Sequence, residues 1–108
     1  MANGKVTVLA RIKAKSGMEE KVRLEAVSLV APTRSEPGCI DYVLHRSADD
    51  KSAFMFYENW ESKEALDRHL QTPRLKAFVE KAGQMLAEPL DVTLWEIIGS
   101  PISSAQGV

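Results

Sequence analysis

Two runs of alternating apolar and polar side chains, residues 39–47 and 53–60, limit the possible folds of this chain more than any other feature. Alternation with a period of two is typical of a β-strand that buries one face. The polar stretch Ala48-Asp-Asp-Lys51 between the runs has the composition of a turn. The middle of the chain is therefore predicted to hold two strands joined by a short turn.

Two further strands are predicted near the ends of the chain. Residues 5–14 alternate in the same way, and residues 90–98 are apolar on both faces. After the first strand, Ser16 and Glu19 form a capping box, which predicts a helix that begins at residue 17. Its apolar stripe repeats at helical spacing through Met18, Val22, Ala26, Leu29 and Val30.

The second helical region has two start signals. Ser62 is a good N-cap, and Thr72 followed by Pro73 predicts that the helix restarts there. The resulting order is β-α-β-β-α-β, the ferredoxin-like α+β arrangement, with a four-stranded antiparallel sheet and both helical regions on one face. The other face would expose an apolar patch, so a two-fold homodimer through that face is expected. The patch consists of Leu9, Val43, Met55, Tyr57 and one row of the last strand.

Length and charge narrow the class of protein. The 108 residues suit one domain, predicted to span 1–98, with a tail at 99–108 that is mobile or lies over a partner. The net charge of −1 means that basic side chains are not in excess to bind a phosphate backbone, so no nucleic acid partner is expected. One cysteine, Cys39, fits a reducing compartment, and no apolar run approaches the roughly 20 residues that span a membrane. Without a signal-peptide core, a cytoplasmic protein is expected.

An acid and a histidine are the candidate catalytic residues. Alternation places Phe56, Glu58 and Trp60 on the strand face that meets the helices. A buried carboxylate is costly without a partner, so Glu58 is expected to pair with His69 or, alternatively, with Arg46 or another basic residue. His69 is the candidate base, because an ordinary histidine pKa of about 6.5 suits proton transfer near neutral pH. The alternative for His69 is a local hydrogen bond with no catalytic role.

Aromatic side chains are the candidate pocket walls. Trp60 can stack on an aromatic substrate and Tyr42 can donate a hydrogen bond to it, although both also suit a core position. His45 and Asn59 belong to the opposite sheet face and are expected at the dimer interface, while Cys39 is expected to pack as a small residue. The sequence has no glycine-rich phosphate loop and no metal-ligand pair at helical spacing, so no metal and no cofactor is expected.

A series of short motifs runs through roughly residues 4–98, almost the whole domain. The motifs are Glu36-Pro-Gly-Cys39, Tyr42, Leu44-His-Arg46, Asp49-Asp50, Phe56-Tyr-Glu58-x-Trp60-x-Ser62, Ala65-Leu66, His69 and Pro73-x-x-Lys76-x-Phe78. In this order they resemble the antibiotic biosynthesis monooxygenase (ABM) family. The resemblance implies a dimeric α+β barrel whose members oxidise quinols or polyketide-derived phenols with O2, without metal, flavin or haem. Haem-degrading relatives use an asparagine in the first strand, and residues 6–14 contain none.

The expected function is therefore a cofactor-independent monooxygenase that acts on a small quinol or phenol. In this reading His69 and Glu58 are catalytic, and Trp60, Tyr42, Phe56 and Leu66 bind the substrate. Two alternatives stay open. One is a non-oxidative isomerase, in which Arg46 or Arg11 would have to hold an anionic group. The other is a dimer without catalysis that only binds a small ligand, which an apolar pocket filled by its own side chains, with no cavity of roughly 300 Å3, would favour.

Overall fold

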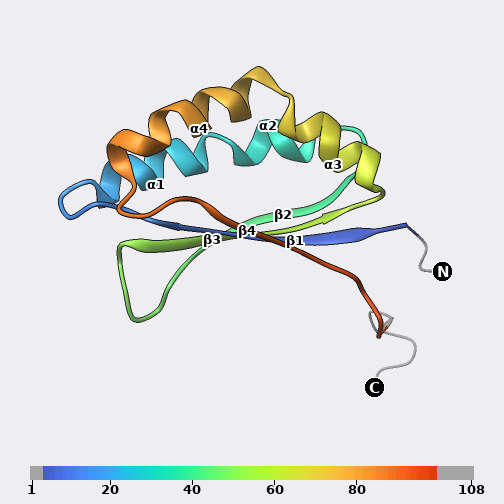
Figure 1. The fold of residues 1–108 in the computed structure, drawn as a ribbon, viewed down its shortest axis with the longest axis horizontal. Coiled ribbons are helices and arrows are strands. Elements are labelled where there is room, and N and C mark those ends of the chain that lie inside the picture. The colour runs from blue at the N-terminus through green and yellow to red at the C-terminus, as the bar shows by residue number, and fades with distance from the viewer. Residues whose placement is uncertain (1–3, 100–108) are drawn as a thin grey trace.

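A computed structural model describes residues 4–99 of the chain, and its centre is a four-stranded antiparallel sheet (Figure 1). The strand order β2-β3-β1-β4 follows from the pairing of β1 with both β3 and β4. This is the ferredoxin-like order that the sequence predicts. The strands are β1 (Val6–Lys13), β2 (Cys39–Arg46), β3 (Ala53–Trp60) and β4 (Asp91–Trp95).

All helices cover one face of this sheet (Figure 1), as predicted. The two predicted starts in the second helical region are confirmed. The Ser62 hydroxyl accepts a hydrogen bond from the Ala65 backbone N–H, and Thr72 does the same for Leu75, with Pro73 in the first turn. The helices are α1 (Glu19–Val27), α2 (Val30–Arg34), α3 (Lys63–Leu70) and α4 (Pro73–Met85).

The first helical region differs from its prediction. The helix begins at Glu19 and not at residue 17, because Gly17 has a φ of +88° that no helix contains. The Gly17 N–H donates to Glu19 Oε1 at 2.9 Å, and Met18 occupies the N-cap position without a side-chain hydrogen bond. The region also divides in two, and at the break the Ser28 hydroxyl donates to the Glu25 carbonyl. The predicted capping role of Ser16 is therefore wrong.

The strand β2 contains a bulge that the alternation of its sequence does not reveal. Cys39 pairs with Trp60 and Asp41 pairs with Asn59, so Ile40 is an extra residue in the strand. Cys39 consequently lies on the helix-facing side and packs against the core, and not on the side of Asp41 as alternation predicted. From Asp41 onward the predicted faces are correct, with Tyr42 buried under the helices.

The turn before β2 approaches α3 very closely. Gly38 has a φ of +87°, and a Cβ added to it would lie 2.5 Å from the Cβ of Ala65. The Gly38 carbonyl accepts a hydrogen bond from the Glu61 N–H at 2.8 Å. Only glycine combines this backbone conformation with so short an approach. The contact brings the segment that contains Glu36 against the helix that carries His69.

The sheet face without helices carries apolar side chains that are partly exposed. Val43 is 37% exposed, Tyr57 38% and Trp95 54%. On the same face, near the end of β3, Asn59 is buried, accepts a hydrogen bond from the Thr7 hydroxyl, and donates to Asp41 and Tyr57. Asn59 and His45 thus lie on the face that alternation predicted.

The remaining predictions concern the last strand, the C-terminal tail and the presence of a membrane-spanning helix. The last strand spans Asp91–Trp95, which is shorter than the predicted 90–98, and residues 100–108 of the predicted tail lie outside the described residues. Among residues 4–99, no helix has both the length and the apolar character needed to cross a bilayer.

Candidate functional site

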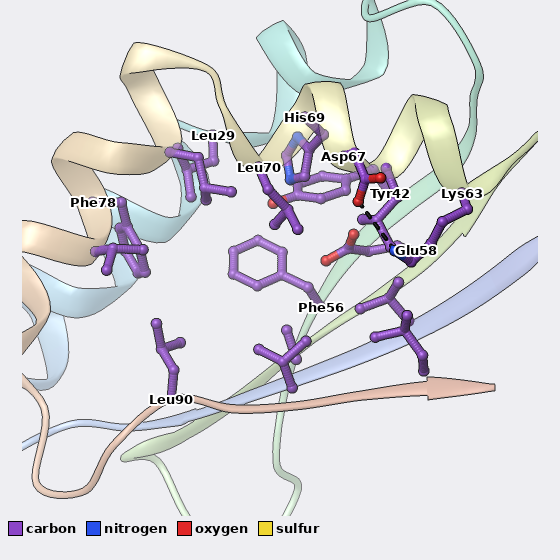
Figure 2. Close-up of a pocket in the computed structure, with 17 residues that line it drawn as sticks. Leu29, Tyr42, Phe56, Glu58, Lys63, Asp67, His69, Leu70, Phe78 and Leu90 are labelled. Carbon is purple, nitrogen blue, oxygen red and sulfur yellow. Dashed lines mark hydrogen bonds and ion pairs between the residues drawn. The ribbon is translucent and has the colours of Figure 1, made fainter.

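A pocket of about 220 Å3 lies between the sheet and helices α3 and α4 (Figure 2). Figure 2 shows the Phe56 ring in the middle of the lining residues, with His69 and Tyr42 on one side of it and Glu58 close to Tyr42. Most of the lining is apolar, so a ligand inside it would be largely desolvated. The lining residues are Val8, Ala10, Leu29, Tyr42, Phe56, Glu58, Lys63, Leu66, Asp67, His69, Leu70, Leu75, Phe78, Val79, Leu90, Val92 and Leu94.

Glu58 is a buried carboxylate on the wall of this pocket. Its exposure is 4%, and its Oε1 accepts a hydrogen bond from Trp60 Nε1 at 2.8 Å. Burial disfavours the charged form and raises the pKa of Glu58 to about 7, although the Trp60 hydrogen bond acts in the opposite direction. Glu58 can therefore both hold and release a proton near neutral pH.

His69 forms its hydrogen bonds with Glu36, a residue outside the pocket lining. Nδ1 lies 3.1 Å from Glu36 Oε1 and 3.2 Å from Oε2, and Arg74 Nη2 donates to Glu36 Oε2 at 2.5 Å. The expected pairing of Glu58 with His69 or with Arg46 is thus wrong. Glu58 accepts from Trp60, which is two residues along the same strand face, and the Arg46 guanidinium lies over the Phe54 ring.

Aromatic rings enclose the imidazole of His69. The Trp60 ring centroid lies 4.7 Å from that of His69, and the Tyr42 centroid lies 5.6 Å away in an edge-on arrangement. Burial is the largest influence on the pKa of His69 and lowers it, while Glu36 raises it and Arg74 lowers it. The net direction is downward, so the imidazole is neutral at pH 7.

The structure places the predicted site residues as follows. His69, Glu58, Tyr42, Phe56 and Leu66 all line the same pocket.

Trp60 is the exception among the predicted site residues. It is fully buried behind the wall, where it contacts His69 and donates to Glu58, and it is not among the lining residues. The structure thus gives the indole a supporting position and not the exposed face that stacking on a ligand requires. The roles of all these residues in catalysis and binding stay predictions.

Sequence reasoning missed several features of the site. Glu36 stands in the Glu-Pro-Gly-Cys motif, but nothing in its local sequence indicates a contact with His69, and no local pattern distinguishes Arg74. Near the opening, Lys63 and Asp67 form an ion pair at 3.3 Å, which their i,i+4 spacing on α3 indicates. The mouth of the pocket is apolar and consists of four half-exposed residues, Leu70, Val79, Val92 and Leu94.

A second, more open hollow of about 540 Å3 lies at the β2–β3 hairpin end of the sheet. Arg11, His45 and Arg46 line this hollow and not the first pocket. Lys13 also contributes to it but is paired with Asp50 at 2.5 Å. Across residues 4–99, no three His, Cys, Asp or Glu side chains gather in a way that could hold a metal ion.

Comparison with known proteins gives a consistent family match. A family model described as "Antibiotic biosynthesis monooxygenase" matches residues 5–81. The Bacillus subtilis protein named "Putative monooxygenase YcnE" is 33% identical over 92 residues, which cover 85% of this chain and 97% of that protein. A Synechocystis protein, "Uncharacterized protein sll1783", is 35% identical over 96 residues. That alignment covers 89% of this chain but 65% of the relative, so this chain spans about two thirds of that protein's length.

Solved structures show the same fold. The crystal structure of PA3566 from Pseudomonas aeruginosa superposes with a TM-score of 0.85 at 29% sequence identity. The superposition covers 92% of this chain and 99% of that chain. The similarity in fold therefore extends over most of the sheet and the helices.

Proposed function

The chain belongs to the antibiotic biosynthesis monooxygenase family, and from this premise we propose that it oxidises a small quinol or phenol with O2 without an added cofactor. The reaction needs no external reductant, because the substrate supplies the electrons. A phenol and one O2 give a quinone and one water. The protein has to supply a base, an acid and an apolar pocket for the aromatic ring.

One observation carries the proposal: Glu58 and His69 line one apolar pocket, and their surroundings shift their pKa values in opposite directions. Titratable groups that differ in this way are typical of acid and base pairs in active sites. His69 is neutral at pH 7 and can accept a proton. Glu58, with a pKa of about 7, is partly protonated at the same pH and can donate one.

These properties suggest an order of proton transfers. His69 takes the hydroxyl proton of the substrate, and the electron-rich anion that remains passes an electron to O2. Recombination of the two radicals forms a carbon–oxygen bond and a peroxide. Glu58 then protonates the outer peroxide oxygen. As the oxygen–oxygen bond breaks, the ring carbon loses its hydrogen as a proton to the Glu58 carboxylate and becomes a carbonyl, and the departing oxygen takes a second proton from His69 and leaves as water.

The size of the pocket limits the substrate. Apolar cavities of about 150 Å3 accommodate benzene, so a pocket of about 220 Å3 suits one ring with small substituents. This volume is below roughly 300 Å3, so by that criterion it favours the alternative of a dimer that only binds a small ligand, and it also limits any substrate to a small one. A single-ring hydroquinone therefore fits better than a fused polycyclic phenol.

The isomerase alternative receives no support from the pocket. An anionic substrate would need an unpaired cation, but Arg11 and Arg46 line the other hollow. The lysine at the pocket, Lys63, is already paired with Asp67 at 3.3 Å. A phosphorylated metabolite would instead meet the Glu58 carboxylate, which disfavours it.

We further propose that the helix-free sheet face pairs with a second copy of the chain. Support comes from the exposed apolar side chains of Val43, Tyr57 and Trp95 on this face. A monomer would leave them in contact with water. Pairing by a two-fold axis would bury the same residues on both copies.

Oxygen uptake with single-ring hydroquinones tests the proposed activity. We expect consumption of one O2 per substrate molecule by the purified protein without added cofactor. His69→Ala and Glu58→Gln should each lower kcat by about 100-fold, since general acid–base catalysis contributes 10²–10⁴. Glu64→Gln is the control, because Glu64 is exposed on α3 and does not line the pocket. Binding of the hydroquinone without oxygen uptake would favour the dimer that only binds a ligand.

A further inference from the structure

A carboxylate and an arginine stand behind His69, on the side away from the pocket lining. Glu36 precedes β2, while His69 lies on α3 and Arg74 in the first turn of α4. The His69 side chain is 3% exposed and the Glu36 side chain 13%, so water has little access to the hydrogen bonds between them. Hydrogen bonds to a charged group in such surroundings are stronger than neutral ones.

The geometry determines which nitrogen of His69 carries the proton. Glu36 already accepts a hydrogen bond from the Arg74 guanidinium, so its carboxylate acts as an acceptor. Nδ1 of His69, at 3.1 Å from Oε1, must then be the donor. In a neutral imidazole the other nitrogen, Nε2, carries a lone pair and no hydrogen. Nε2 is therefore the nitrogen available to a ligand in the pocket.

Several contacts hold Glu36 in this place. Arg74 binds its Oε2, and the Gly38 turn fixes the backbone two residues further along against Ala65. The Glu36 N–H also donates to the Thr33 carbonyl at 3.0 Å. A carboxylate held in this manner can fix the orientation and tautomer of the histidine that it contacts.

We propose that Glu36, clamped by Arg74, is a positioning residue that keeps His69 in the Nδ1–H tautomer and leaves Nε2 as the proton acceptor for the substrate. This inference rests on the proposed function in one respect only, namely that His69 acts as the base. The arrangement of the three side chains can be tested without any substrate.

Nitrogen-15 NMR of the two imidazole nitrogens is the direct test. A His45→Gln background leaves His69 as the single histidine, which removes any ambiguity of assignment. We expect a protonated Nδ1 and an unprotonated Nε2 at pH 7. Glu36→Gln should shift the population toward the other tautomer, because the amide can donate to Nδ1. Glu64→Gln, an exposed carboxylate on the same helix α3, should leave both resonances unchanged.

Arg74→Gln is a second variant that keeps the carboxylate of Glu36 and removes its clamp. It should broaden or partly shift the His69 resonances without a full change of tautomer. An Nε2–H tautomer in the unmodified site, or identical spectra with and without the Glu36 carboxylate, would overturn the inference.

Kinetics separate positioning from binding and from the proposed activity itself. With a hydroquinone, Glu36→Gln should lower kcat by about 10- to 100-fold, the range for carboxylates that orient a functional histidine. KM should change little, because Glu36 does not line the pocket. An unchanged kcat in an active protein would overturn the inference. If no quinol is oxidised at all, the proposed function fails, while the tautomer measurement still decides whether Glu36 positions His69.

Discussion

Replacement of Glu58 by glutamine should stabilise the protein at alkaline pH while it removes activity. Glu58 is 4% exposed, and burial raises its pKa from an ordinary value of 4.5 to about 7. Glutamine has nearly the same shape, and its carbonyl can still accept from Trp60 Nε1. It carries no charge that burial could disfavour. The two proteins should therefore differ mainly in how their stability depends on pH.

The direction and size follow from proton linkage. Between pH 4.5 and about 7 the folded protein holds a proton on Glu58 that the unfolded chain has lost. Stability conferred by the neutral acid is thus fully present below pH 4.5 and is lost as the pH rises through 7. One pKa unit corresponds to about 1.4 kcal/mol, so the total loss is about 3 kcal/mol. Glu58→Gln should match the unmodified protein at pH 4 and exceed its stability by about 3 kcal/mol at pH 8.

Urea denaturation at a series of pH values measures this difference. With slopes typical of small proteins, about 3 kcal/mol moves the midpoint by roughly 1–3 M urea. Glu64→Gln serves as the control, because that carboxylate is exposed and its replacement should leave a constant difference. A stability difference between Glu58→Gln and the unmodified protein that does not change from pH 4 to pH 8 would refute the reasoning.

Three further predictions concern the turn, the indole and the dimer. Gly38→Ala should lower the free energy of unfolding by about 2–4 kcal/mol, because the backbone has a positive φ and the added Cβ would lie 2.5 Å from that of Ala65. Gly17→Ala has a similar φ but open space around it, and should lower it by only about 1–2 kcal/mol. Equal losses in urea titrations would contradict this. Trp60→Phe removes the N–H donor that lowers the pKa of Glu58, so that pKa should rise. In a pH–rate profile the alkaline limit of kcat should move upward by about one pH unit or less, and a downward shift would contradict the role of Glu58 as the acid. Val43→Lys should convert the proposed dimer to monomer in size-exclusion chromatography with light scattering, and an unchanged mass would argue against pairing through this face.

The sequence correctly predicted those helix starts and strand faces that depend on residues close together in the chain. Ser62 and Thr72 cap their helices because the bonded N–H groups lie three residues further along. Strand alternation correctly placed Glu58 under the helices. Ser16 failed as a cap because Gly17 adopts a positive φ, which interrupts the predicted first turn.

The partners within the site could not be predicted in the same way. Glu36 and His69 are separated by 33 positions along the chain, and they meet because the Gly38 turn packs on α3. The bulge at Ile40 depends on the register between β2 and β3, which no local pattern encodes. Glu58 accepts its hydrogen bond from Trp60, its neighbour on the same strand face. His69 therefore pairs with Glu36, a carboxylate from the segment that precedes β2.

Oxygen-isotope labelling tests the central claim most directly, namely that Glu58 and His69 assist transfer of an oxygen atom from O2 to an aromatic ring. Metal-stripped protein would be given a single-ring hydroquinone under 18O2, and the product would be analysed by mass spectrometry. The account predicts one labelled oxygen atom per product molecule, formed at a rate that falls about 100-fold in Glu58→Gln and in His69→Ala. An unlabelled product would contradict it, and so would a labelled product that both variants form as fast as the unmodified protein does.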